Sequence, residues 1–277
     1  MNEQWLGQLI EGAYDAAVDG LWYEWLDWLR RSLGASGGVL AHLGTAGLPV
    51  KSLPIACGSD LCSNLVGTYV ERRSQDPWYR QARRQRNNVV LLDARTRRAR
   101  ARGELSGVFE GWKCHYHTGA VLSSEQGHYL LSLHREPGQS DFNAEQIRML
   151  DQINQHLRQA LALTPFLYER VEQRLHRCRL DEREQPQAVV RENGVPAFVN
   201  DAMAAYLRGQ GHAFRFHHGR LCGRKPLLDR LLQQAQQQAC QGQTGVCRLP
   251  LEHGALSVSP LPEEVLPRAA LWQIQHA

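Results

Sequence analysis

Five aromatic side chains in two short stretches of this sequence are its strongest candidates for a binding site. They are Trp78, Tyr79, Phe109, Trp112 and Tyr116. Aromatic walls with a few polar tips suit a small, flat or acyl-bearing molecule. Aromatic residues at helical spacing also commonly fill the core of a fold, and that alternative stays open here. The sequence therefore offers these five positions either as a ligand-binding site or as core packing.

Cys114, His115 and His117 carry atoms that bind metal ions. On a strand, His115 and His117 would face the same side. A metal site needs a further ligand from elsewhere in the chain, and the sequence marks none. The pair His217-His218 would point to opposite faces of a strand and is a weaker candidate. We therefore expect no metal site.

The sequence lacks the motifs that mark common catalytic sites. It contains no G-x-S-x-G and no well-supported pairing of a cysteine with a histidine. No P-loop and no G-x-G-x-x-G follows a predicted strand. We therefore expect no catalytic residues and a protein that is not an enzyme.

Charge and composition narrow the class of protein further. The chain has 277 residues, of which 43% are hydrophobic and 22% charged, with a net charge of +4. Its basic residues cluster in Ala94–Glu104, which could attract phosphates weakly or form a solvated loop or short surface helix. No aromatic residues interleave there to stack on bases. This balance does not by itself predict nucleic-acid binding.

Membrane and secretion signals are not apparent in the sequence. No run approaches eighteen apolar residues, and the N-terminal residues include acids but no basic segment. The seven cysteines are an odd number, which argues against a disulfide framework. We expect a cytoplasmic protein that does not enter the membrane.

The first half of the chain predicts helices packed on an antiparallel sheet. Asp76 before Pro77 marks a helix start, because Asp is a good N-cap and Pro is favoured at the first helical position. Apolar residues at helical spacing and short apolar runs mark the other elements. We expect helices at 6–17, 22–33, 61–69, from 76 onward and at 104–117, and strands at 37–43, 89–92, 119–124 and 128–135. This order indicates an α+β domain.

A long helix follows, in which Asn143 and Gln146 form a capping box. Apolar positions then recur at alternating steps of three and four residues, a seam that suits a partner helix. They are Leu150, Ile153, Leu157, Ala160, Thr164, Leu167 and Val171. We expect a homodimer through residues 150–171, with packing on the parent domain as the alternative. Pro165 should bend this helix.

The polar stretch Asp181–Gln187 ends the helical pattern, and we place a domain boundary there. Ala188–Arg191 and Pro196–Val199 then predict two strands joined by a turn at Asn193-Gly194, which would supply the two positive φ angles of a two-residue hairpin. Asn200 or Asp201 would cap the next helix. Beyond it we expect a strand pair within 214–223, a helix at 226–241 and strands at 247–253, 255–261 and 270–275.

The segment Ala188–Leu207 resembles the opening of a PAS-type sensory domain. The whole chain resembles the signal-receiving part of bacterial LuxR-type helix-turn-helix regulators. The matching segments are Leu9–Leu40, Asp76–Ala82, Phe109–Trp112, Phe142–Leu161, and the motifs NGVPAFVN and HHGRL of the second half. The resemblance implies two GAF/PAS-like domains at 1–142 and 188–277, joined by a connecting and dimerisation helix at 143–181.

The resemblance also implies what to expect of cofactors and DNA. Phe198, Asn200, Phe214 and Phe216 would surround the cavity that holds heme or flavin in some relatives. No helical His stands at a credible heme position, so we expect no cofactor. In this family a DNA-binding domain follows the last strand, whereas this sequence ends at Ala277. We therefore expect no specific DNA binding by the chain as given.

Together these features predict a non-enzymatic sensory protein that controls transcription by sensing a small ligand. The alternative is a protein-interaction module, such as an anti-activator, that binds a partner protein without a small molecule. An empty cavity lined by the aromatic group would favour the receptor, and a filled core would favour the interaction module.

Overall fold

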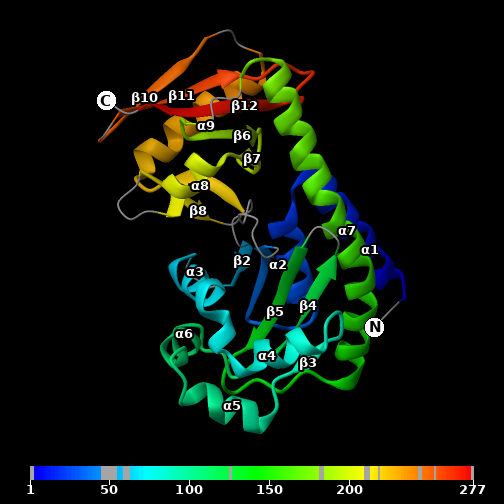
Figure 1. Cartoon of the computed structure of the whole chain (residues 1–277). Coiled ribbons are helices and arrows are strands. Elements are labelled where there is room, and N and C mark those ends of the chain that lie inside the picture. The colour runs from blue at the N-terminus through cyan, green and yellow to red at the C-terminus, as the bar shows by residue number, and fades with distance from the viewer. Residues whose placement is uncertain are drawn as a thin grey trace. The chain divides into compact units, whose positions relative to one another are not determined.

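The computed structural model describes residues 3–44, 55–58, 63–124, 127–180, 184–208, 213–217, 219–242, 245–252 and 254–275 (Figure 1). The chain divides into two compact units, Met1–Thr164 and Pro165–Ala277. In each unit an antiparallel sheet is flanked by helices, so the expected α+β class is confirmed. None of the helices within the described ranges has the length and apolar content that a membrane crossing requires.

The first unit is built on a five-stranded antiparallel sheet in the order β2-β1-β5-β4-β3. Its strands are β1 (Gly37–Gly44), β2 (Ile55–Cys57), β3 (Val90–Leu91), β4 (Tyr116–Ser124) and β5 (Gly127–Arg135). Its helices are α1 (Glu3–Asp19), α2 (Trp22–Ser32), α3 (Ser63–Arg72), the 3-10 helix η1 (Arg73–Gln75), α4 (Pro77–Arg84), α5 (Ala94–Ala101) and α6 (Ser106–Gly111). The long helix α7 (Ala144–Arg177) begins in this unit.

The two faces of this sheet differ in chemistry because side chains alternate along each strand. One face, which we call the apolar face, packs with α1, α2 and α7 through residues such as Ala120, Leu122, Leu131 and Leu133. The opposite face, which we call the mixed face, packs with α3, α4 and α6. Its central positions include His117 on β4 and the buried Ser132 and His134 on β5. Polar side chains are therefore concentrated on one side of the sheet.

Most of the elements expected from the sequence are present in the first unit, with differences around residue 110. The expected helix at 104–117 is wrong beyond Gly111, where α6 ends. Lys113 adopts a left-handed backbone (φ 49°), and the N–H of Cys114 bonds back to the carbonyl of Phe109. These contacts terminate the helix, and the chain continues into β4 from Tyr116. Strand β2 was not expected, and the basic run forms a true helix, α5.

Helix α7 begins at the predicted capping box. The N–H of Gln146 donates to Asn143 Oδ1 at 2.9 Å, and the N–H of Asn143 donates to Gln146 Oε1 at 3.0 Å. The helix runs without interruption across Pro165, where the two compact units divide. The division thus falls earlier than the expected boundary at Asp181–Gln187, of which residues 181–183 lie outside the described ranges.

Most residues of the predicted α7 seam are buried inside the two units. Its first four residues, Leu150, Ile153, Leu157 and Ala160, are buried in the core between α7 and the apolar face. Val171 is buried in the core of the second unit. The side chain of Leu167 is not among those that the structure describes. A homodimer through 150–171 stays a prediction, but these buried side chains are not free to form it.

The second unit has a five-stranded antiparallel sheet in the order β10-β11-β12-β6-β7 and a separate hairpin, β8-β9. The strands are β6 (Gln187–Arg191), β7 (Pro196–Val199), β8 (Phe214–His217), β9 (Arg220–Gly223), β10 (Cys247–Leu251), β11 (Gly254–Pro260) and β12 (Ala269–Gln275). Helix α9 (Pro226–Cys240) covers one face. Helix α8 (Asp201–Arg208) is capped by Asn200, one of the two predicted caps, whose Oδ1 accepts from the N–H of Met203 at 2.8 Å.

Two expectations for the second unit need correction. Of Asn193 and Gly194, only Gly194 has a positive φ (81°), because four residues connect β6 to β7 and Asn193 Oδ1 instead accepts from the N–H of Val195. Phe198 and Phe214 do not surround one cavity, since they are buried in separate cores on opposite faces of the sheet. Asn200 is a half-buried helix cap, and the side chain of Phe216 lies outside the description.

Gly119 allows β4 and β5 to pair closely at the centre of the first sheet. A Cβ atom there would lie 2.0 Å from the carbonyl oxygen of Leu131. We predict that Gly119→Ala lowers the free energy of unfolding by about 3 kcal/mol or more, since the strand backbones would have to separate. Urea unfolding followed by tryptophan fluorescence measures this, because six of the seven tryptophans lie in the first unit.

The matched control is Gly107→Ala. Gly107 lies in α6, is exposed and has no neighbouring atom within 4 Å of an added Cβ. Alanine should leave stability unchanged or raise it by up to about 1 kcal/mol through its helix propensity. Equal effects of the two substitutions would contradict the close approach at Gly119.

Candidate functional site

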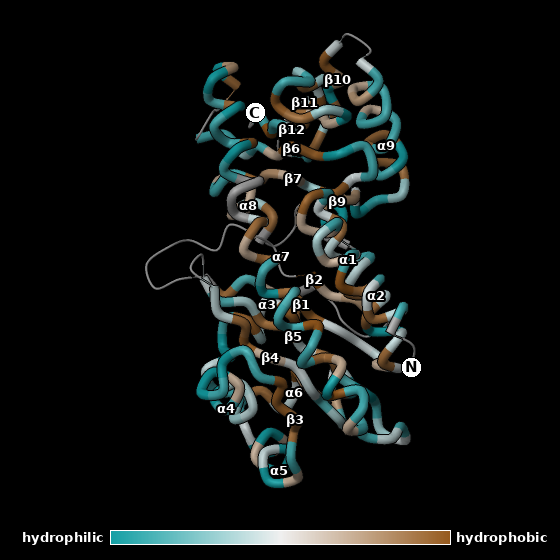
Figure 2. The backbone as a smooth tube through the Cα atoms, turned by 90° about the vertical axis from the view of Figure 1, so that its right-hand side faces the viewer, coloured by the Kyte–Doolittle hydropathy of each residue, from teal (hydrophilic) through white to brown (hydrophobic). Residues whose placement is uncertain are grey.

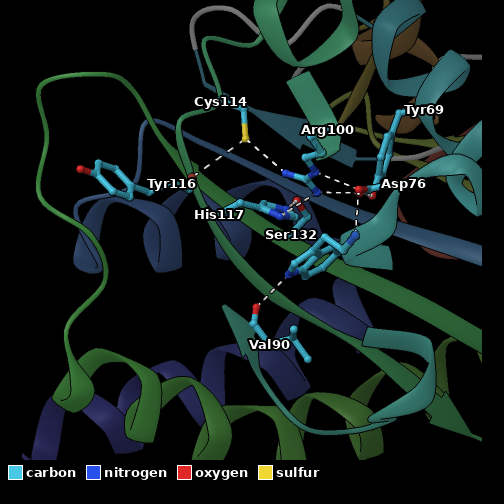
Figure 3. Close-up of polar contacts among 9 residues, drawn as sticks. Tyr69, Asp76, Val90, Arg100, Cys114, Tyr116, His117 and Ser132 are labelled. Atoms are coloured by element: carbon cyan, nitrogen blue, oxygen red, sulfur yellow. Dashed lines mark hydrogen bonds and ion pairs between the residues drawn. The ribbon is translucent and has the colours of Figure 1, made fainter. Parts of the chain in front are cut away.

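Five polar side chains from five elements converge beside the mixed face of the first unit. They are Tyr69 on α3, Asp76 before α4, Arg100 on α5, His117 on β4 and Ser132 on β5. All five are buried, with relative exposures of 4% or less. Figure 3 shows the Arg100 guanidinium between Asp76 on one side and His117 on the other. We call this group the buried polar cluster.

Asp76 joins three helices through its two carboxylate oxygens. Its Oδ1 accepts from the backbone N–H of Trp78 at 3.0 Å, which caps α4 as the sequence predicts. Its Oδ2 accepts from the hydroxyl of Tyr69 at 2.9 Å. Both oxygens also accept from Arg100, Oδ1 from Nε at 2.8 Å and Oδ2 from Nη2 at 2.6 Å. This two-pronged geometry is the one that suits an arginine and a carboxylate best.

Arg100 is a buried cation in a helix whose other arginines are partly or fully exposed. Burial opposes its charge, but the hydrogen bonds and charge of Asp76 outweigh that effect and raise the pKa of Arg100. Its guanidinium carbon lies 4.0 Å from the centre of the Phe109 ring, and Nη1 lies 3.8 Å from Cys114 Sγ. The cation is thus held by an anion, an aromatic face and a sulfur atom.

The contacts of His117 fix its tautomer. Arg100 Nη2 lies 3.0 Å from His117 Nδ1, and a guanidinium can only donate, so Nδ1 is the acceptor. The ring proton of the neutral imidazole is therefore on Nε2, which donates to Ser132 Oγ at 2.6 Å. The Trp78 ring packs edge-on against this imidazole, with centroids 4.0 Å apart.

Burial shifts the acid–base properties of the cluster. It lowers the pKa of His117 well below its ordinary value of 6.5, and the charge of Arg100 adds to the effect. Burial and the neighbouring Asp76 raise the pKa of Tyr69 well above 10. Burial also raises the pKa of Cys114 to about 11. Near neutral pH the cluster therefore holds one ion pair, a neutral imidazole and a neutral phenol, and the adjacent Cys114 is a thiol.

The serine and histidine of the cluster are not arranged for nucleophilic catalysis. A catalytic histidine must take the serine proton on a free nitrogen. In His117 the nitrogen that faces Ser132 already carries a proton, and the other nitrogen is occupied by Arg100. Among the described residues, no group of three or more His, Cys, Asp or Glu side chains is placed to hold a metal ion. His218 and the side chain of His217 lie outside those residues.

The structure brings together four of the five aromatic residues predicted for a binding site. Trp78, Tyr79, Phe109 and Trp112 are buried in the core on the mixed face. Tyr116 packs against the core on the apolar face instead, because it precedes His117 on β4 and so points the opposite way. The buried polar cluster thus lies beside four of the five predicted aromatic side chains, and Tyr116 lies on the other face of the sheet.

Among the four aromatic residues of this layer, Trp112 has a buried polar group without a partner in the described residues. It is 2% exposed and packs against the rings of Tyr69, Phe109 and His134, with centroids 5.2, 6.0 and 6.2 Å away. Its indole Nε1 is buried and finds no hydrogen-bond partner within the described residues. A buried donor without an acceptor costs about 1–3 kcal/mol. Within the described residues this N–H is therefore a buried donor without an acceptor.

Sequence reasoning missed Tyr69, Arg100 and Ser132. In the sequence Arg100 is one member of the basic run, and nothing in ARTRRARA distinguishes it from its neighbours. Ser132 carried a weak signal, because it interrupts the apolar residues of a buried strand and so points to a polar environment. Asp76 was recognised as a helix cap but not as an ion-pair partner.

Comparison with known proteins adds little to this description. No protein-family model matches the chain, and no curated protein matches it. The crystal structure of the E. coli DhaR(N)-DhaL complex aligns at 13% identity and a TM-score of 0.30, covering 98% of this chain and 87% of that chain. The bacteriophytochrome RpBphP3 from R. palustris aligns at 11% identity and a TM-score of 0.33, covering 100% and 63%. Scores this low support no statement about function.

Loss of Arg100 should destabilise the first unit. Arg100→Met leaves the Asp76 carboxylate buried without its cation, and we predict a loss of about 3–5 kcal/mol in the free energy of unfolding. Arg98→Met is the control, because Arg98 lies on the same helix but is exposed, and it should change stability by less than about 0.5 kcal/mol. Urea unfolding of both variants measures the difference. Equal losses would contradict a special role for Arg100.

His117 should make the first unit sensitive to acid. Its pKa is depressed in the folded state, so below pH 6.5 the unfolded chain binds a proton that the folded chain does not. The free energy of unfolding should therefore fall as pH falls below 6.5, by up to about 1.4 kcal/mol per pH unit from this group.

The control for this prediction is His117→Gln, which does not titrate and can still accept from Arg100 and donate to Ser132. We expect the variant to lose less stability than the wild type between about pH 6.5 and 5. Urea unfolding at several pH values gives both curves. Parallel curves would show that His117 contributes nothing to the acid sensitivity.

Proposed function

We propose that this chain is a non-enzymatic, cytoplasmic sensory protein that controls transcription and whose first unit binds a small molecule next to the mixed face. One observation carries the proposal: the buried indole N–H of Trp112 lacks an acceptor within the described residues, in an aromatic layer beside the buried polar cluster. Small-molecule sites combine such apolar walls with a few placed polar groups.

The chemistry of this region narrows the ligand class. Trp112 Nε1 is a donor, so the ligand should offer an acceptor such as a carbonyl or carboxylate oxygen. The neighbouring rings of Tyr69 and Phe109 favour a flat or acyl-bearing body. We therefore propose a small ligand with a carbonyl-type oxygen as the input signal.

The non-enzymatic part of the proposal is supported by the hydrogen bonding of His117. Its protonated Nε2 faces Ser132, so the only Ser–His pair in the cluster lacks a base. The link to transcription is supported by the resemblance of segments such as Asp76–Ala82 to the receiving part of LuxR-type regulators. Asp76 starts that segment and is central to the cluster. On the basis of the same resemblance, we propose that the first unit is a GAF/PAS-like sensing domain.

A protein-interaction module without a small ligand is the second candidate. It is favoured by the packing of the aromatic layer, in which Tyr69, Phe109 and Trp112 are in mutual ring contact. A layer whose rings fill the space between the helices and the sheet would leave a small molecule little room. In that case the signal would be a partner protein.

Native mass spectrometry of the protein purified from its own host separates the two candidates. The sensing proposal predicts an added small mass that is lost on denaturation. Trp112→Phe keeps an aromatic ring but removes the N–H. We expect it to weaken the affinity for the ligand about tenfold, because loss of a buried hydrogen bond costs about 1–3 kcal/mol, and so to lower the occupied fraction wherever the ligand is not in large excess.

The matched control is Trp28→Phe, since Trp28 lies on α2 and is 36% exposed. This variant should keep the wild-type occupancy. A wild-type protein that carries no small molecule would contradict the sensing proposal and favour the interaction module. Equal occupancy in both variants would exclude Trp112 as the donor.

A further inference from the structure

Helices α4 and α5 contact each other, and a dense group of exposed arginines lies on them and on the residues that directly follow each helix. We call this group the arginine surface. It consists of seven exposed side chains, Arg80, Arg83, Arg84, Arg86, Arg95, Arg98 and Arg102. Figure 2 shows the hydrophilic colouring along α4. Only the Ala94–Glu104 part of the surface is apparent as a basic run in the sequence.

Within the described residues, no acidic side chain pairs with the arginine surface. None of its seven guanidinium groups forms an ion pair within the part of the chain that the structure describes. Between residues 80 and 102 the chain has nine arginines and a single acid, Asp93, whose carboxylate is occupied in capping α5. The whole chain has a net charge of only +4, so the remainder is net negative. Positive charge is therefore concentrated at this surface.

The field of this surface reaches the neighbouring sheet. His128, at the start of β5, has a pKa below its ordinary value of 6.5, first because of burial and then because of the positive charges of Arg86 and Arg83. Arg83 and Arg86 therefore lie close enough to this edge of the sheet to affect a titratable group on it.

Helix α5 is held in a fixed orientation by its two inward-facing arginines. Arg100 pairs with Asp76, and Arg97 lies 4.8 Å over the Tyr116 ring with Nη1 3.2 Å from His115 Nε2. Arg95, Arg98 and Arg102 follow each other at steps of three and four residues, so they share the opposite, outward face. The outward cations are thus presented on a rigid helix and need little ordering on binding.

We propose that the arginine surface binds the phosphate backbone of duplex nucleic acid without reading its sequence. Guanidinium groups match phosphates in a two-pronged geometry. A duplex carries one negative charge per about 1.7 Å of axis, so several phosphates can meet the two helices at once. An acidic peptide would have to become ordered on binding, which costs free energy. No aromatic side chain of α4 or α5 is exposed to stack on single-stranded bases.

Fluorescence anisotropy of a labelled random-sequence duplex of about 24 base pairs tests the proposal across roughly 25–200 mM salt. Contact with four or five phosphates predicts a slope of about −4 for the logarithm of affinity against the logarithm of salt concentration. The triple variant Arg95→Gln, Arg98→Gln and Arg102→Gln should weaken binding at least about tenfold at low salt and flatten the slope by about 2.7.

The control is the triple variant Arg170→Gln, Arg177→Gln and Arg248→Gln, which removes the same charge from exposed positions outside the arginine surface. It should keep the wild-type affinity within about twofold. Four outcomes would overturn the proposal: no duplex binding at low salt, equal loss in both variants, a clear preference among duplex sequences, or tighter binding of a single strand. Tighter binding of a polyglutamate peptide than of the duplex would also overturn it and would point to an acidic protein partner.

Discussion

The ion pair between Arg100 and Asp76 is the interaction on which the mixed face of the first unit depends. Asp76 caps α4, accepts from Tyr69 on α3 and anchors α5 through Arg100. Arg100 in turn fixes the tautomer of His117 on β4. One carboxylate and one guanidinium therefore hold three helices and a strand in register. Because α5 has few apolar side chains, burial of hydrophobic surface could not hold this helix against the rest of the unit.

The same pair explains why polar groups are tolerated inside this layer. Buried charges are stable only when their hydrogen-bonding capacity is met. Asp76 accepts four hydrogen bonds, and Arg100 makes contacts through all three of its nitrogens. Trp112 packs in the same layer but departs from this pattern, because its indole N–H has no hydrogen-bond acceptor among the described residues. This unpaired N–H is the feature on which the proposed ligand-binding role of the layer rests.

Local patterns in the sequence predicted much of the fold, and contacts distant in sequence explain what was missed. The Asp76-Pro77 start, the Asn143 capping box and the strands β4 and β5 are encoded by residues a few positions apart. The burial of Arg100 depends on a carboxylate twenty-four residues earlier, which no local pattern reveals. Tyr116 was grouped with Trp112 because the helix was expected to continue, and the left-handed Lys113 that stops it carries no sequence signature.

The distribution of donors on Arg100 bears on how this chain can change during evolution. Its nitrogens reach both oxygens of Asp76, the ring of His117 and the sulfur of Cys114. A lysine offers a single ammonium and cannot span these partners. Exchange of arginine for lysine should thus leave the fold of homologous chains intact at 95, 98 and 102 but not at 100. Positions 76 and 100 should instead vary together, so an aligned family would show the ion pair as a coupled pair of columns.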